Sequence, residues 1–155
     1  MAVVVLALTP GTQSGTVPLE HPPVFTAVRG LTLSPHAKPL SVAVAGAEAI
    51  QMVALTSQRA VRESRVGCSP QQIVALPNGT KGLVVNRGPG SLAGFDSRCY
   101  TVSQTIRVDT TPHGLAGSSV ARTASGAHEG SQDVSVVGGA SSTVTATSME
   151  ATLRV

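Results

Sequence analysis

The segment PNGTK, residues 77–81, separates two apolar runs, Gln72 to Leu76 and Gly82 to Asn86. Asn and Gly both tolerate positive φ, so Asn78-Gly79 between such runs is typical of the tight turn of a β-hairpin. An isolated hairpin is marginally stable in water and needs further strands to bury its apolar face. The motif therefore predicts antiparallel β-structure in the middle of the chain.

Strand signals continue on both sides of this hairpin. From Thr101 to Thr110, apolar and polar residues alternate with a period of two, and Gln104 is the polar exception on the apolar face. Near Thr147 and Ser148, the apolar residues of the final segment change from even to odd positions, which predicts a β-bulge. Further strands are predicted at Ala2 to Leu8, Val24 to Leu33 and Val134 to Val137.

Residues 47–62 allow two interpretations. Ala47, Ile50, Ala54 and Val61 fall on one face of a helix, and the helix propensities of the segment support that structure. The same residues fit a hairpin with its turn at AGAEA, residues 45–49. The β-rich surroundings favour the hairpin.

The length of 155 residues fits one domain. Residues 1–23 form a predicted N-terminal strand and Pro-rich arm, and residues 24–155 form a single β-rich domain. Gly88 to Gly94 and Thr111 to Gly130 are predicted to be irregular connections, and we find no convincing internal repeat. The predicted fold is mainly β: a single antiparallel β-sandwich or jelly-roll-like domain with an extended N-terminal arm, with one helix around 47–62 as the open alternative.

The composition indicates how such a core would be built. Aromatic residues make up 2% of the chain and charged residues 12%, which is about half the usual share of charge. Small aliphatic side chains suit closely packed sheets, and a surface poor in charge suits one that neighbouring subunits cover. The low charge also excludes a disordered chain of the highly charged type.

Glycines 88, 90 and 94 suggest a phosphate-binding loop, but the pattern fails. A dinucleotide fingerprint needs G-x-G-x-x-G between a strand and a helix, whereas the last interval here is one residue too long. The segment after Gly94 does not begin a helix, and no Gly-Lys-Ser/Thr sequence is present. We therefore predict no cofactor.

Catalytic and metal-binding patterns are weak. No G-x-S-x-G elbow occurs, and each histidine stands in a Pro- or Gly-rich segment. His128, Glu129 and Asp133 offer three metal-binding groups within six residues, but a polar turn explains them better. The sequence predicts neither an enzyme nor a metal site.

Arg59, Arg62 and Arg65 form the one local basic cluster, and Glu63 interrupts it. They are a candidate basic interface patch. The net charge of +3 is spread along the chain, and three aromatic residues cannot form a base-stacking platform. A phosphate contact by scattered arginines is the remaining route to nucleic acid, and it has little support.

Cys68 and Cys99 are the two cysteines, and they leave open one disulfide or two free thiols. No segment approaches the roughly 20 apolar residues of a membrane span, and the apolar run from Val3 to Leu8 lacks the basic flank of a signal peptide. Nothing else marks the chain as secreted, which favours free thiols.

These observations predict a structural assembly subunit that packs against copies of itself and other assembly subunits. The most plausible setting is a viral or phage virion, as a capsid, cement or decoration component. The alternative is an extracellular β-sandwich binding module stapled by Cys68–Cys99. Edge strands with little protective charge need to be covered, and this favours the assembly subunit.

Overall fold

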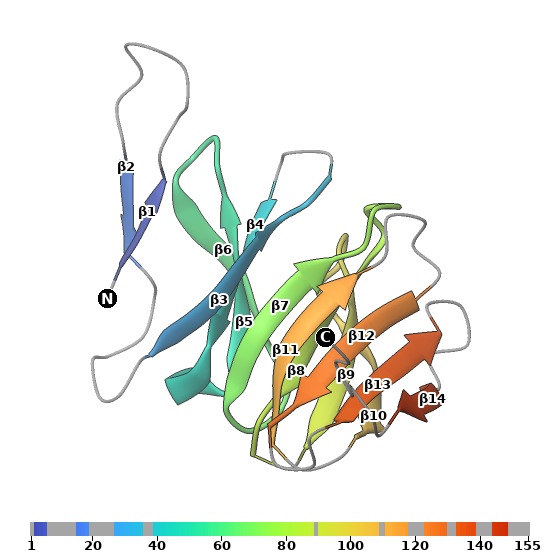
Figure 1. Ribbon diagram of the computed structural model, residues 1–155. Coiled ribbons are helices and arrows are strands. Elements are labelled where there is room, and N and C mark those ends of the chain that lie inside the picture. The colour runs from blue at the N-terminus through green and yellow to red at the C-terminus, as the bar shows by residue number, and fades with distance from the viewer. Residues whose placement is uncertain are drawn as a thin grey trace, which may run out of the picture.

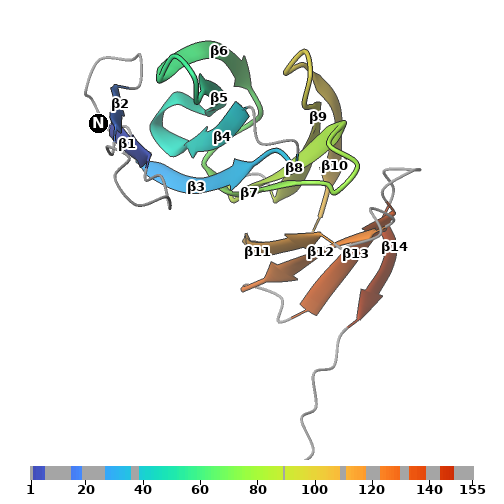
Figure 2. The ribbon, with the colours of Figure 1, turned by 90° about the horizontal axis from the view of Figure 1, so that it is seen from above.

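The computed structural model describes residues 2–5, 15–18, 27–35, 39–88, 90–108, 111–117, 123–129, 133–138 and 144–148. The described strands are all paired antiparallel, which confirms the prediction of a mainly β, antiparallel protein. They form three four-stranded sheets and one two-stranded sheet. The four-stranded sheets pack face to face and fan out from one side, with their first strands innermost (Figures 1 and 2).

Each four-stranded sheet is a simple meander in chain order, without the crossing connections of a jelly roll. The first sheet contains β3 (Val28–Leu33), β4 (Pro39–Val44), β5 (Ala49–Ala54) and β6 (Arg59–Arg65). The second contains β7 (Pro70–Ala75), β8 (Lys81–Asn86), β9 (Ser91–Asp96) and β10 (Val102–Arg107). The third contains β11 (Pro112–Gly117), β12 (Thr123–His128), β13 (Asp133–Gly138) and β14 (Val144–Ser148).

The three sheets are successive copies of one structural repeat. Their first strands begin at Val28, Pro70 and Pro112, which are equally spaced along the chain. One backbone hydrogen bond recurs at the same spacing: the N–H groups of residues 45, 87 and 129 donate to the carbonyls of residues 27, 69 and 111. Positive φ values also recur one repeat apart, at Glu48 and Gly90, Gln58 and Tyr100, and Ser69 and Thr111. The prediction that the chain contains no internal repeat is therefore wrong.

The ambiguous segment 47–62 is a hairpin and not a helix. A short 3-10 turn, η1 (Ala45–Ala47), leads into β5, and β5 pairs with β6. Helical periodicity was misleading because β5 is covered on both faces, so Ala49, Ile50 and Gln51 are all buried and alternation is lost.

Two predicted connections are strands. Ser91 to Gly94 belongs to β9, where Leu92 and Ala93 are buried between neighbouring sheets. The small residues of this segment are typical of a loop sequence. In the structure they allow the neighbouring sheets to pack closely against β9. Residues 111–130 contain β11 and β12, and Gly114 and Gly126 lie within these strands. The pairing of β13 with β14 skips Thr145, two residues before the bulge predicted at Thr147 and Ser148.

The N-terminal strand is β1 (Ala2–Val5), which pairs with β2 (Gly15–Pro18) inside the predicted Pro-rich arm. This two-stranded sheet lies beside the first four-stranded sheet (Figure 1), and β2 contacts its outermost strand, β6.

Candidate interaction surface

The boundary between the first and second sheets shows how neighbouring repeats fit together. Register places Ile73, Val84 and Ala93 side by side on one face of the second sheet. That face packs on Ala43 and Ile50 of the first sheet in one buried cluster. Side chains of this size give a thin, dry layer that does not require large aromatic residues.

The boundary between the second and third sheets follows the same plan. Leu83, Val85 and Leu92 lie on the opposite face of the second sheet and form a buried cluster with Leu115 of β11. Leu115 occupies the position in its repeat that Ile73 occupies in the preceding one. In both boundaries, an aliphatic residue of an innermost strand packs into the preceding sheet.

The turn between β9 and β10 makes hydrogen bonds across the boundary between the first and second sheets. The Tyr100 hydroxyl lies 2.5 Å from the Ser41 Oγ, and the Tyr100 ring is 5.7 Å from that of Phe95. Ser64 Oγ donates to the carbonyl of Tyr100, and Arg62 Nη1 donates to the carbonyl of Cys99. Burial raises the pKa of Tyr100, although its hydrogen bond with Ser41 acts in the opposite direction.

The first and third sheets each have an outer face. Among the described residues, no further four-stranded sheet covers either of these faces. We define the head face as the side of the first sheet that points away from the second. Leu31 and Leu33 of β3 lie on it and are exposed. Beside them is a buried cluster of Leu40, Val42, Val44 and Val53. The exposed leucines of this face therefore lie along its innermost strand.

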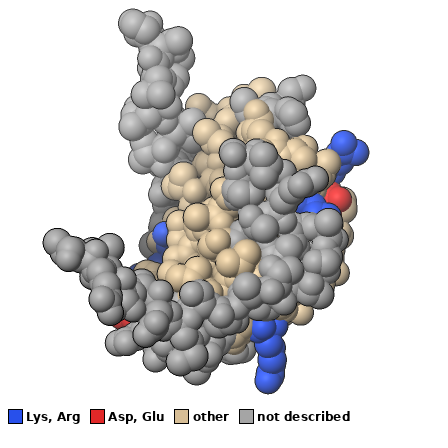
Figure 3. All heavy atoms as spheres, turned by 45° about the vertical axis from the view of Figure 1, so that its right-hand side comes forward, with Lys and Arg blue, Asp and Glu red and all other residues tan. Residues whose placement is uncertain are grey.

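We define the tail face as the side of the third sheet that points away from the second. Register pairs Ala116 with Ser125 and Ala127 with Val134, which places them on this face together with Val136. None of these side chains is charged. In Figure 3, most of the described surface in view is neither acidic nor basic, and the charges stand at separate points.

The predicted basic interface patch is divided between two faces. Cross-strand pairs place Arg59 with Ala54 and Arg62 with Met52, on the side of β5 and β6 that packs toward the second sheet. Arg65 pairs with Ala49 on the opposite side. The three arginines therefore do not form one patch, and Arg62 instead holds the turn at Cys99.

Cys68 and Cys99 are both free and both exposed, so the structure lacks the disulfide of the alternative module. Cys68 lies next to Glu48, and a hydrogen bond to that carboxylate and its negative charge raise the pKa of the Cys68 thiol. Cys99 Sγ lies 3.0 Å from Thr101 Oγ1. The Cys68 thiol is therefore a weaker nucleophile than an ordinary exposed cysteine.

Asn78 and Gly79 lie in the turn that joins β7 and β8. The Gly79 N–H donates to the Leu76 carbonyl at 2.9 Å, and the Thr80 N–H donates to Asn78 Oδ1 at 3.1 Å. Gly79 has a φ of 66°, which an L side chain rarely adopts. These contacts stabilise the hairpin.

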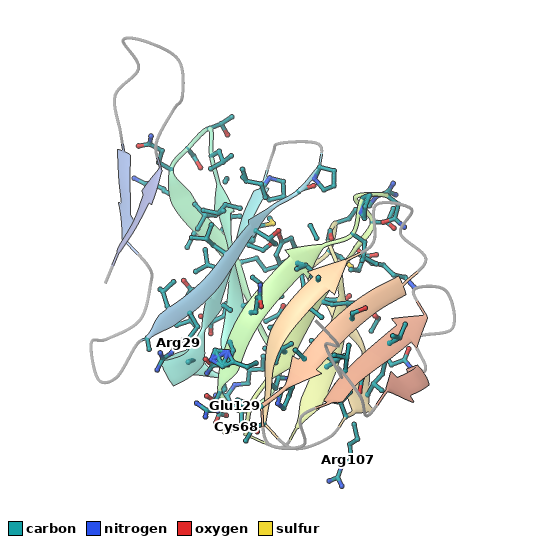
Figure 4. The ribbon with its side chains drawn as sticks, in the orientation of Figure 1. Arg29, Cys68, Arg107 and Glu129 are labelled. Atoms are coloured by element: carbon teal, nitrogen blue, oxygen red, sulfur yellow. The ribbon has the colours of Figure 1, made fainter. Side chains whose placement is uncertain are left out.

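Figure 4 shows Arg29, Cys68, Arg107 and Glu129 at one end of the sheets, where β3 begins and β10 ends. At this end, Arg87 Nη2 and Glu129 Oε2 lie 3.4 Å apart, both on exposed side chains. Among the described residues, no three His, Cys, Asp or Glu side chains come together as a metal site. The His128 and Asp133 side chains, candidates in the sequence, lie outside the described set.

Four-stranded meanders that repeat about an axis, with their first strands innermost, are the blades of a β-propeller. One similar solved structure is Kuenenia stuttgartiensis hydrazine synthase, with a TM-score of 0.79 and 20% identity. The match covers 88% of this chain and 39% of that one, so the chain spans less than half of its neighbour's length. At 20% identity, the likeness shows a shared fold and carries no function.

No protein-family model and no curated protein sequence matches this chain. Within the described part of the chain, no helix is long and apolar enough to span a membrane.

Sequence reasoning missed the residues of the head and tail faces because it missed the repeat. The available signal was the dipeptide Ser69-Pro70, which recurs as Thr111-Pro112 one repeat later, each proline being followed at the same spacing by Ile73 or Leu115. The corresponding dipeptide at the start of β3 is Ala27-Val28, so the first repeat has no proline at this position.

Proposed function

We propose that this protein is a structural assembly subunit that acts by repeated protein–protein packing, with other β-sheets covering its two end faces. The supporting observation is the exposure of Leu31 at 57%, at a repeat position where Ile73 is 2% and Leu115 is 5% exposed. At this repeat position, the aliphatic side chain is buried in both repeats that follow another four-stranded sheet in the chain. An unpaired end of a repeat array is normally capped or covered.

The composition supports the same proposal. Exposed apolar residues that lie together on a sheet face mark surfaces that associate. Repeat arrays need polar capping units to stay soluble alone, and the described tail-face side chains carry no charge. The subunit therefore contributes two extended faces, whereas an enzyme would need a group of reactive side chains.

Sedimentation velocity over a micromolar concentration range tests the proposal. We expect the wild-type protein to form discrete oligomers whose population increases with concentration. A stable monomer throughout this range, with no higher species, would contradict it. Placement in a virion, and the absence of a catalytic role, remain predictions from composition.

A further inference from the structure

The head face and the tail face are the two halves of a contact that the chain already makes twice. On the head side, Leu31 stands where Ile73 and Leu115 stand in the next two repeats. Ile73 packs among first-sheet residues, and Leu115 packs among second-sheet residues. The partner that Leu31 lacks is therefore the tail side of a sheet of this repeat.

The tail face provides that side. Its residues Ala116, Ser125, Ala127 and Val134 occupy the repeat positions of Val74, Leu83, Val85 and Leu92, which surround Leu115 at the second boundary. Val134 is 39% exposed, although Leu92 at the same repeat position is 1% exposed. The tail face thus has the repeat position of a surface that receives an innermost-strand leucine, and its described side chains are small and uncharged.

The two-stranded sheet leaves the innermost strand of the head face exposed, although the Leu40, Val42, Val44 and Val53 cluster beside it is buried. Its strand β2 contacts β6, the outermost strand of the first sheet, whereas Leu31 and Leu33 on the innermost strand remain exposed. Figure 2 shows the two end sheets at opposite ends of the fan. Within the described part of one chain, the head face therefore does not meet the tail face.

We propose that two copies of this chain join head to tail, with Leu31 of each copy packed on the Val134 side of the other. This inference rests on the proposed assembly function. A heterologous contact closes into a ring when its rotation permits. Three four-stranded sheets in each of two copies give six, within the range of about four to eight blades found in propellers.

Complementation between charged variants tests the direction of the contact. Leu31→Arg blocks the head and Val134→Arg blocks the tail, and both residues are exposed, so circular dichroism should show an unchanged fold. Each variant alone should sediment as a monomer, because both contacts of its dimer are damaged. An equimolar mixture should restore a dimer, because one intact head meets one intact tail. Thr105→Arg, on the exposed outer strand β10, is the matched control and should dimerise like the wild type.

Crosslinking gives an independent readout in a Cys68→Ser/Cys99→Ser background. Oxidation of a mixture of Leu31→Cys and Val134→Cys proteins should yield a disulfide-linked dimer, and neither protein alone should do so. A dimer from Leu31→Cys alone, or self-association of Val134→Arg, would overturn the head-to-tail contact while the assembly function stands. A monomeric wild-type protein would overturn both.

Discussion

The hydroxyl groups of Ser41 and Tyr100 lie 2.5 Å apart across the boundary between the first and second sheets. Both residues are buried, so each hydroxyl depends on the other for a hydrogen bond in a region that is otherwise apolar. Tyr100 reaches this position because it has a φ of 55° at the end of the β9–β10 turn. The pair therefore fixes the alignment of two successive sheets.

Removal of either hydroxyl should destabilise the protein by leaving the other one buried and unpaired. We expect Ser41→Ala and Tyr100→Phe each to lower the free energy of unfolding by roughly 1–3 kcal/mol in urea titrations. The double variant should lose less than the sum, because the second change removes the unpaired group. Ser103→Ala, which removes an exposed hydrogen bond to the Gly94 carbonyl, should cost less than about 0.5 kcal/mol. Additive losses at positions 41 and 100 would contradict the pairing.

Ionisation of the buried Tyr100 hydroxyl should also lower the stability of the protein at alkaline pH. Burial raises its pKa above the ordinary value of about 10, so the folded state holds the proton more tightly than the unfolded state. The resulting stability is present below the ordinary pKa and is lost as the pH rises through the folded one. Tyr100 is the one tyrosine, so the ultraviolet absorbance of tyrosinate reports it directly. Titration at the ordinary value in the folded protein would count against this environment.

Gly82 accommodates the ring of Phe95 on the neighbouring strand. A Cβ at Gly82 would lie 2.2 Å from a ring carbon of Phe95, whereas a Cβ at Gly94 would have no neighbour closer than 3.6 Å. We expect Gly82→Ala to destabilise the protein by roughly 1–3 kcal/mol through overpacking. Gly94→Ala should be neutral or slightly stabilising, because alanine restricts the unfolded chain. Equal thermal midpoints for the two variants would show that the ring moves freely.

The sequence predicted the local elements better than their arrangement. The Asn78-Gly79 turn could be placed because two adjacent residues determine its backbone. The strand Val102–Arg107 showed clear alternation because it is outermost in its sheet and one side is solvated. In contrast, β9 is covered on both faces and contains Gly94, so its sequence SLAGFD resembles a loop.

The repeat was hidden because its positions share geometry and not residue identity. Glu48 and Gly90 share a positive φ, and so do Gln58 and Tyr100, although the side chains have nothing in common. The candidate interaction surface could not be predicted for the same reason. Leu31 is distinctive only by comparison with Ile73 and Leu115, and that comparison requires the repeat.

The β9–β10 turn depends on the carboxylate of Asp96. Its Oδ1 accepts hydrogen bonds from the N–H groups of Cys99 at 3.0 Å and Arg98 at 2.7 Å, which lower the pKa of Asp96. The carboxylate stabilises the fold above its ordinary pKa of about 4, and this contribution is lost as the pH falls through the lowered value. Asp96→Ala should reduce the thermal midpoint at neutral pH more than Asp96→Asn, which keeps an acceptor. A thermal midpoint for Asp96→Asn as low as that of Asp96→Ala would argue against a stabilising role for the hydrogen-bond acceptor at position 96.

Gly30 sets the closest approach between the innermost strands of the first two sheets. A Cβ at Gly30 would lie 2.6 Å from the carbonyl oxygen of Gln71 and 3.0 Å from the Cα of Gln72, and both are backbone atoms of β7. Because backbone cannot rotate away, Gly30→Ala should separate the sheets and lower the free energy of unfolding by roughly 1–3 kcal/mol in urea titrations. Gly114 occupies the same repeat position in β11, but its added Cβ would meet only the Ala127 Cβ at 3.5 Å, an ordinary contact. Gly114→Ala is therefore the matched control and should retain wild-type stability, whereas equal losses at the two positions would show that the cost comes from the strand itself and not from sheet packing.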